Sequence, residues 1–301
     1  MNNTTPKTKP MTQIKSNSIN SFIPLDPALV AALQRNVGAA LEEDIGAADL
    51  TGKLVPALQR VQASVVVREQ AVLCGSPWFD AVMEALDPSI VLDWQYAEGD
   101  LMTADSVVCH IDGLAVKLLT AERSALNFLQ LLSAVATATR KYVNLVAGTS
   151  ATILDTRKTL PGLRLAQKYA VRVGGGQNQR LALYDGILIK ENHIAAAGGI
   201  ALSLQAAKSL DAGVSIQVEV ETLDELHQAL DAGAVSILLD NFSTSMMRSA
   251  VEFNAGRALL EASGGVDLST VRAIAETGVD RISIGSLTKD IKAIDFSLRI
   301  V

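Results

Sequence analysis

Cations stand beside short apolar runs in the second half of the sequence. Arg157 and Lys158 follow the run at 152–154, and Lys190 follows a second run, with Arg180 a few positions before it. Arginine and lysine bind carboxylates and phosphates through paired, charge-assisted hydrogen bonds. If the four cations converge, they predict a ligand that carries several negative charges. Each cation taken alone is equally compatible with a solvated loop residue.

Two carboxylates belong to the apolar runs that come next. Glu219 lies inside the run at 215–220, where an unpaired acid is costly to desolvate, and Asp240 ends the following run. Two carboxylates beside a polyanion repel it unless a divalent cation lies between them or a positive centre develops in the substrate. Both conditions suit a sugar diphosphate that binds together with Mg²⁺. We therefore predict Mg²⁺ as the cofactor. Asp240, like Asp155 before Thr156, has the alternative of capping the helix that follows.

Glycine-rich turns follow the last two apolar runs. They contain Ser263, Gly264 and Gly265 in the first turn, and Gly285 and Ser286 in the second. Backbone N–H groups near helix starts bind phosphate, and the loops after the last two strands are the usual phosphate position in β/α barrels. We therefore predict a phosphate at these turns. The glycines at 174–176 match no nucleotide-binding loop motif, and we interpret them as a structural turn.

The elements that must position these groups alternate regularly. Apolar runs span 152–154, 186–189, 215–220, 235–239, 258–261 and 280–284, and helical stretches between them include 200–210, 222–231 and 267–276. Strands that alternate with helices indicate parallel β/α units, here with fewer strands than the eight of a complete TIM barrel. The carboxyl ends of all strands in such a barrel open on one face, so one cleft would collect the polar groups.

The first half of the chain has a less regular pattern. Runs at 61–67 and 107–111 indicate strands, helical segments at 27–42 and 77–86 lie among them, and the combination predicts a small α+β domain. Apolar spacing from 118 to 147 predicts one or two long helices between the two halves. We expect three divisions of the chain. Residues 1–22 form a disordered tail that does not resemble a secretory signal. An α/β sandwich domain takes up 23–118 together with the C-terminal segment 289–301, and a β/α barrel takes up 119–288.

Composition limits the classes of function. The 301 residues carry a net charge of −6, which argues against a nucleic-acid partner because phosphate backbones bind to basic faces. The apolar runs are too short to cross a bilayer, so we expect no membrane partner. Cys74 and Cys109 form neither a CxxC pair nor a Cys/His cluster, which favours the reducing cytoplasm as the location.

Several continuous stretches together resemble one enzyme family. The main one is LDTRKTLPGLRLAQKYAVRVGGGQNQR, followed by LYDGILIKENHI. Shorter ones are EDIGAADLT at 43–51, TAERSALNFLQ at 120–130, VEVE at 218–221, ILLDN at 237–241, EASGG at 261–265 and ISIGSLT at 282–288. In these stretches the chain resembles quinolinate phosphoribosyltransferases, and the likeness covers essentially everything after the tail.

The resemblance implies a fold, an activity and an assembly. The fold is α/β, with an open-faced α/β sandwich domain before an incomplete, six-stranded β/α barrel. The activity is transfer of phosphoribosyl from phosphoribosyl pyrophosphate to quinolinate with decarboxylation, which yields nicotinate mononucleotide. The assembly is a homodimer or higher homo-oligomer whose active sites each borrow a cation, Arg123, from the partner.

Site residues also carry over from the resemblance, position by position. Arg157, Arg180 and Lys190 would bind the quinolinate carboxylates, and Lys158 would meet the pyrophosphate. Glu219 and Asp240 would face the ribose and hold Mg²⁺, and with Lys158 they form the implied catalytic set. The remaining implied substrate contacts are Arg123, Thr156, Gln179, Ser263, Gly264, Gly265, Ile284, Gly285 and Ser286, the last six around the 5′-phosphate.

One position departs from the family pattern. Where family members commonly have Asn-His-Arg, this chain has Asn178, Gln179 and Arg180. Glutamine donates a hydrogen bond to a carboxylate but does not titrate near neutral pH, so an acid role at this position is in doubt.

Three alternatives compete with this interpretation. A Schiff-base lyase would use Lys190 as an amine nucleophile on a barrel strand. A non-catalytic or molybdenum-associated paralogue would keep the anion pocket without the reaction. A nicotinate phosphoribosyltransferase would need fewer cations, because its substrate has one carboxylate.

Overall fold

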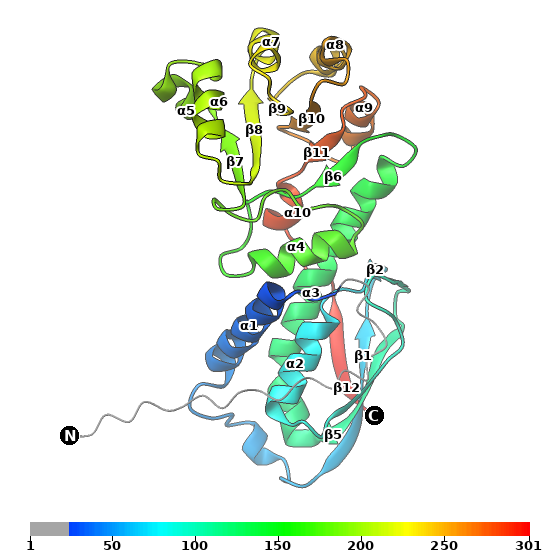
Figure 1. The fold of residues 1–301 in the computed structure, drawn as a ribbon. Helices are drawn as coiled ribbons and strands as arrows, with labels where there is room; N and C mark the ends of the chain where they lie inside the picture. The colour runs from blue at the N-terminus through cyan, green and yellow to red at the C-terminus, as the bar shows by residue number, and fades with distance from the viewer. Residues whose placement is uncertain (1–23) are drawn as a thin grey trace, which may run out of the picture.

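The computed structural model describes residues 24–301, so the tail predicted over 1–22 lies outside the described residues. An antiparallel sheet, formed by three strands of the first half of the chain and the last strand of the second, has the order β12-β1-β5-β3. Its strands are β1 (Arg60–Val67), β3 (Val91–Trp94), β5 (Val107–Leu114) and β12 (Phe296–Ile300). β12 is the last strand of the chain and pairs with β1, with Val65 opposite Leu298. The C-terminal segment therefore returns to the first sheet (Figure 1).

Helices cover one face of this sheet (Figure 1). They are α1 (Pro27–Ile45), α2 (Ser76–Leu86) and the first part of α3 (Ala115–Leu145). Every second residue of β1, from Ala63 to Val67, is buried in one apolar cluster with Trp78 and Phe79 of α2. Such alternation is what a strand with one covered face requires. The shorter elements of this half are η1 (Gly52–Leu54), β2 (Ala71–Val72) and β4 (Leu101–Met102).

The long helical stretch forms one helix rather than two. α3 has 31 residues and is about 46 Å long at 1.5 Å per residue. Leu126 and Leu129 of this helix belong to the apolar core of the first half, whereas Tyr142 belongs to the core of the second. Because one helix serves both cores, the division between residues 118 and 119 stays a prediction.

The second half of the chain forms a parallel sheet of six strands in the order β6-β11-β10-β9-β8-β7. Its strands are β6 (Thr152–Leu154), β7 (Gly186–Ile189), β8 (Ser215–Val220), β9 (Ser236–Asp240), β10 (Leu259–Ser263) and β11 (Arg281–Ser283). The edge strands β6 and β7 are not paired with each other, so the barrel is open. The predicted fold class, a sandwich followed by an incomplete six-stranded barrel, is confirmed.

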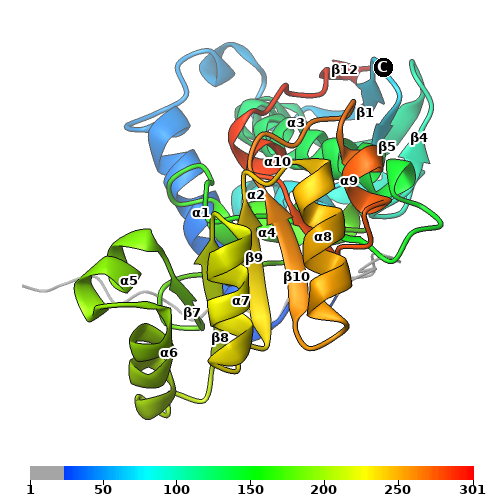
Figure 2. The same ribbon diagram turned by 90° about the horizontal axis from the view of Figure 1, so that it is seen from above.

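Helices surround the outer side of this sheet, and Figure 2 shows α6, α7 and α8 next to one another there. The helices of this half are α4 (Arg164–Val173), α5 (Glu191–Ala197), α6 (Ile200–Ser209), α7 (Leu223–Asp231), α8 (Thr244–Asn254), α9 (Val271–Ala275) and α10 (Ser286–Lys289). Within residues 24–301, no helix combines the length and the apolar character that a membrane crossing needs.

Candidate active site

Alternation along the barrel strands turns polar side chains to the inner face of the sheet. On β8, Val218 and Val220 are buried in the outer apolar core, so Gln217 and Glu219 face the opposite side. The same alternation turns inward Leu238 and Asp240 on β9, and Glu261 and Ser263 on β10. Branched apolar side chains normally fill a β/α barrel, so a polar inner face at the strand ends indicates a ligand site.

A pocket of about 290 Å³ opens over this inner face. It brings together nine residues that the sequence had singled out: Thr156, Arg157, Lys158, Gln179, Arg180, Lys190, Glu219, Asp240 and Ser263. Four further lining residues were not anticipated: Leu188, Leu238, Glu261 and Ser283. The convergence of cations and carboxylates that the strand ends predicted is therefore present in the fold.

Arg157 and Arg180 lie close enough to repel each other. Burial lowers the pKa of the Arg180 guanidinium, and the positive charge of Arg157 lowers it further. Within the described residues neither arginine forms an ion pair, and the buried Nε of Arg157 has no hydrogen-bond partner. Arg180 donates from Nη1 to the carbonyl oxygen of Gly186 at 2.9 Å, which holds its side chain in place. Two adjacent guanidinium groups that form no ion pair with a protein carboxylate suit the binding of an anion.

The two predicted carboxylates each keep one oxygen without a protein hydrogen bond among the described residues. Glu219 is buried, and its Oε2 accepts from Nζ of Lys190 at 2.6 Å. Oδ2 of Asp240 accepts from the side chain of Asn241 at 2.8 Å. The ion pair answers the desolvation problem posed by an acid inside an apolar run. It also gives Lys190 a partner, unlike the desolvated amine that a Schiff-base lyase would need.

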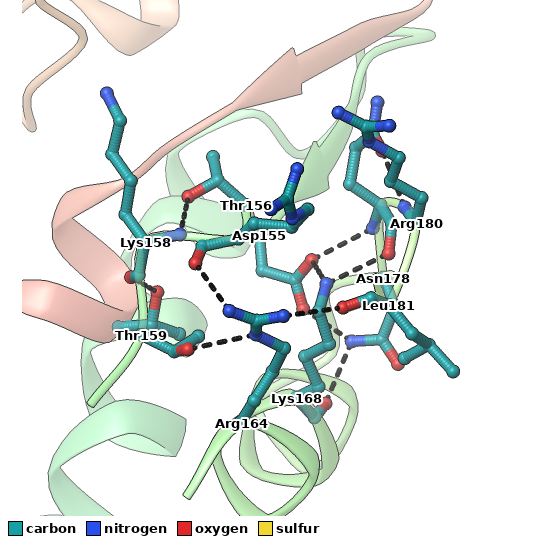
Figure 3. A network of polar contacts seen from close by, with 12 residues as sticks. Asp155, Thr156, Lys158, Thr159, Arg164, Lys168, Asn178, Arg180 and Leu181 are labelled. Atoms are coloured by element: carbon teal, nitrogen blue, oxygen red, sulfur yellow. Dashed lines mark hydrogen bonds and ion pairs between the residues drawn. The ribbon is translucent and has the colours of Figure 1, made fainter. Parts of the chain in front are cut away.

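Asp155 joins the two loops that carry the pocket cations (Figure 3). Its Oδ1 accepts from Nζ of Lys168 at 2.5 Å and from the backbone N–H of Gln179 at 2.9 Å. Its Oδ2 accepts from the side chain of Asn178 at 2.6 Å. Nζ of Lys168 donates also to the carbonyl oxygen of Gln179 at 2.9 Å. The loop after β6 and the loop before β7 are thereby held against α4 by one buried polar network.

The capping alternatives for Asp155 and Asp240 are wrong. Asp155 is fully buried in its network, where burial raises the pKa of its carboxyl and the charge of Lys168 opposes that shift. Ser243, not Asp240, caps α8, because its hydroxyl accepts from the N–H of Met246. Neither aspartate therefore caps a helix: Asp240 lines the pocket, and Asp155 holds the loops that carry the pocket cations.

Arg164 adds a second connection between the same loops (Figure 3). From the first turn of α4 it donates to the hydroxyl of Thr159 at 3.1 Å and to the carbonyl oxygen of Leu181 at 3.2 Å. A third contact, at 3.4 Å, reaches the carbonyl oxygen of Arg157. Sequence reasoning missed Arg164 and Lys168 as site residues. The available signal was Lys168 itself, a charged residue among the buried positions Ala166 to Val171 of α4.

The glycine turns lie beside the predicted site residues. A Cβ at Gly285 would approach Cδ of Lys158 to 3.1 Å, and one at Gly264 would clash with Asn241, the neighbour of Asp240. Gly264 also has a φ of +100°, which side chains rarely adopt. Ile284 is buried in the barrel core, and its N–H donates to the carbonyl oxygen of Leu154, so this N–H is not available to a phosphate.

Six predicted positions are not part of the pocket lining: Gly264, Gly265, Ile284 and Gly285 of the turns just described, and also Ser286 and Arg123. Ser286 lines a different hollow, between α3 and the segment that leads to β12. Arg123 is exposed on α3 and does not reach the pocket of its own chain. The glycines at 174–176 pack tightly on α3, where a Cβ at Gly174 would lie 2.6 Å from the carbonyl oxygen of Ala136, and their structural interpretation is confirmed.

Comparisons with known proteins agree with this geometry. The family model of the quinolinate phosphoribosyl transferase N-terminal domain matches residues 49–133, and that of the C-terminal domain matches residues 135–299. The probable nicotinate-nucleotide pyrophosphorylase (carboxylating) of Bacillus subtilis is 40% identical over 258 residues, which cover 85% of this chain and 89% of the relative. The chloroplastic enzyme of the same name from Arabidopsis thaliana is 38% identical over 292 residues, which cover 89% of this chain and 82% of the relative.

Solved structures give the same result. The nicotinate-nucleotide pyrophosphorylase from Francisella tularensis is 45% identical and superposes with a TM-score of 0.88, covering 90% of this chain and 96% of that chain. The enzyme named so from Pyrococcus furiosus is 17% identical with a TM-score of 0.65, and it supports the fold alone. Since the family models and the relatives cover nearly the whole described chain, this protein belongs to the quinolinate phosphoribosyltransferase family.

Proposed function

We propose that this chain transfers phosphoribosyl from phosphoribosyl pyrophosphate to quinolinate, with release of pyrophosphate and carbon dioxide. The product is nicotinate mononucleotide, a precursor in NAD biosynthesis. One observation carries the proposal beyond family membership: Arg157 and Arg180 lie together at the pocket wall, and within the described residues neither forms an ion pair with a protein carboxylate. An aromatic dicarboxylate satisfies both guanidinium groups at once, whereas a monocarboxylate leaves one of them with solvent.

The reaction requires positioning more than acid–base chemistry. The pyridine nitrogen attacks the anomeric carbon of the ribose while the bond to pyrophosphate breaks, and pyrophosphate keeps the bonding electrons. The ribosylated nitrogen is positive, so it stabilises the electron pair left on the ring when the adjacent carboxylate departs as carbon dioxide. That ring carbon then takes a proton from water. Orientation and electrostatic stabilisation account for catalysis of this kind.

Residues of the pocket fit the parts of this reaction. Arg157, Arg180 and Lys190 orient quinolinate, and the exposed Lys158 stabilises the departing pyrophosphate. Glu219 and Asp240 face the positive charge that develops on the ribose. Ser263 and the turns at 264–265 and 285–286 offer a hydroxyl and N–H groups to the 5′-phosphate.

The carboxylates also suit the proposed Mg²⁺. This ion is usually held by one or two carboxylates together with substrate phosphates and water, not by an all-protein cage. Glu219 and Asp240 each offer one oxygen without a protein hydrogen bond among the described residues. When bound, the ion neutralises charge on the pyrophosphate.

We also propose a homodimer with shared active sites. Arg123 is exposed and does not line the pocket of its own chain, and the segment around η1 exposes Leu50, Leu54 and Leu58 at 74%, 82% and 87%. Apolar side chains exposed to that extent along one segment suit a surface that a second subunit covers.

We propose the reducing cytoplasm as the location of the protein. Cys74 and Cys109 are both free thiols and both buried, which is consistent with that compartment.

A direct assay tests the proposed reaction. Purified protein is incubated with quinolinate, phosphoribosyl pyrophosphate and Mg²⁺, and carbon dioxide and pyrophosphate are followed together. We expect equal amounts of both products, dependence on all three additions, and much lower turnover when nicotinate replaces quinolinate. Binding of quinolinate without product would favour a non-catalytic paralogue, and preferred turnover of nicotinate would overturn the substrate assignment.

A further inference from the structure

Three polar side chains are linked in a chain of hydrogen bonds at the pocket: Gln179 and Glu261 line the pocket, and Gln217 lies between them. Nε2 of Gln179 donates to Oε1 of Gln217 at 2.7 Å. Nε2 of Gln217 donates in turn to Oε2 of Glu261 at 2.9 Å. Gln217 and Glu261 are 6% and 1% exposed, so these bonds form where an unpaired polar group is costly. The mechanism described above uses neither Gln217 nor Glu261.

The direction of this chain is set at both of its ends. At one end the Glu261 carboxylate accepts hydrogen bonds, so the amide of Gln217 turns its NH₂ group toward it and its oxygen toward Gln179. At the other end the backbone N–H of Arg180 donates to Oε1 of Gln179 at 2.5 Å. The NH₂ group of Gln179 therefore faces Gln217.

One N–H of Gln179 remains after these bonds are counted. The NH₂ group carries two hydrogens, and Gln217 takes one of them. Within the described residues the second hydrogen has no protein acceptor, and Gln179 lies on the pocket wall beside Arg180. A neutral donor is thereby presented next to the two guanidinium groups.

We propose that Gln217 and Glu261 are positioning residues that hold the Gln179 amide with its free N–H toward a substrate carboxylate. The inference rests on the proposed function and specifies how this chain binds quinolinate with an amide. Gln217 and Glu261 act only through Gln179 in this role. Neither residue needs to touch the substrate for its replacement to alter quinolinate binding.

A double-mutant cycle separates positioning from general support of the pocket. Gln179→Met and Gln217→Met keep side-chain length and remove the hydrogen bonds. We expect each to raise the KM for quinolinate by about threefold to tenfold, in line with one lost hydrogen bond, with kcat and the KM for phosphoribosyl pyrophosphate changed less than about twofold. The double variant should resemble Gln179→Met alone, because Gln217 has no further route to the substrate.

Glu261→Gln is the matched conservative variant, since its amide oxygen still accepts from Gln217. We expect its quinolinate KM not to rise, because the chain persists and one negative charge near the dianion is lost. Three results would overturn the proposal. They are a quinolinate KM in the double variant that rises by the product of the two single effects, an equal rise in KM for both substrates, and an unchanged quinolinate KM for Gln217→Met. If Gln217→Met does not fold, a rise in quinolinate KM for Glu261→Gln overturns it instead. An inactive wild-type protein would reject the proposed function itself, which is a separate result.

Discussion

The side chains of Asp155 and Lys168 lie 2.5 Å apart in the interior, with exposed fractions of 0% and 1%. The pair joins the loop that carries Arg157 and Lys158 to the loop that carries Gln179 and Arg180 (Figure 3). A buried ion pair has a desolvation cost that only good geometry and further hydrogen bonds offset, and here Asn178 and the Gln179 backbone supply them. Stability and the alignment of the pocket cations therefore depend on the same contact.

Lys168→Met should lower the free energy of unfolding by about 3–5 kcal/mol, because it leaves the Asp155 carboxylate buried without its counter-charge. Urea denaturation followed by circular dichroism measures the change. Lys141→Met, at an exposed position on α3, is the control and should alter stability by less than about 0.5 kcal/mol. Adding Asp155→Asn to Lys168→Met should recover part of the loss. A Lys168→Met protein within about 1 kcal/mol of wild type would contradict the assigned role.

Asp80 makes stability depend on pH. Burial raises the pKa of its carboxyl to about 7, even though the Trp94 indole N–H donates to it at 3.0 Å. A folded-state pKa above the unfolded value of about 3.9 gives stability that is complete below pH 4 and is lost as pH rises through 7. Asp80→Asn keeps an acceptor for Trp94 and should raise stability at pH 8 by about 1–3 kcal/mol.

The measurement is thermal unfolding of both proteins between about pH 4 and about pH 8. We expect the two melting temperatures to lie closest at the acid end of this range and to separate steadily toward the alkaline end, with the variant higher. The exposed Asp93 of β3 provides a matched control, and Asp93→Asn should follow the wild-type curve. Parallel curves for Asp80→Asn and wild type would show that Asp80 titrates normally.

Arg157→Ala removes one of the two guanidinium groups that face the anion. A lost charge-assisted hydrogen bond of about 1.5–3 kcal/mol corresponds to a quinolinate KM raised about tenfold to hundredfold, or to no measurable turnover. Steady-state kinetics with each substrate varied in turn measures the effect. Arg248→Ala changes an exposed arginine of α8 outside the pocket and should leave both KM values unaltered. Unchanged kinetics for Arg157→Ala would remove that residue from the site.

Mixed dimers test whether Arg123 serves the partner. Arg123→Ala and Lys158→Ala should each be nearly inactive, yet a mixed dimer would contain one site with both residues intact. Unfolding and refolding the two variants together should therefore restore about a quarter of wild-type activity, given random pairing in a symmetric dimer. Mixing Lys158→Ala with Lys190→Ala is the control and should restore nothing, since one chain supplies both lysines to a site. No recovery in the first mixture would place Arg123 outside a shared site.

Much of the barrel was predictable because its strands are short, apolar and separated by helical periods. All six predicted strands are present, with bounds that differ by at most a few residues. β3 and β12 were not predicted. β3 has only four residues, and β12 is in a sheet only because it pairs with β1, more than 200 residues earlier in the chain.

Residue types at strand ends already indicated the chemistry of the pocket. Parallel strands end on one face, so cations and carboxylates that follow separate strands must meet, and local sequence contains that information for Arg157, Lys190 and Glu219. The parts that local sequence does not contain are the contacts across strands. Gln217 reaches Glu261, and Asp155 reaches Lys168, only through the register and curvature of the assembled sheet and the packing of α4. Periodicity is a property of neighbouring residues, whereas hydrogen-bond partners distant in sequence depend on how the whole chain packs.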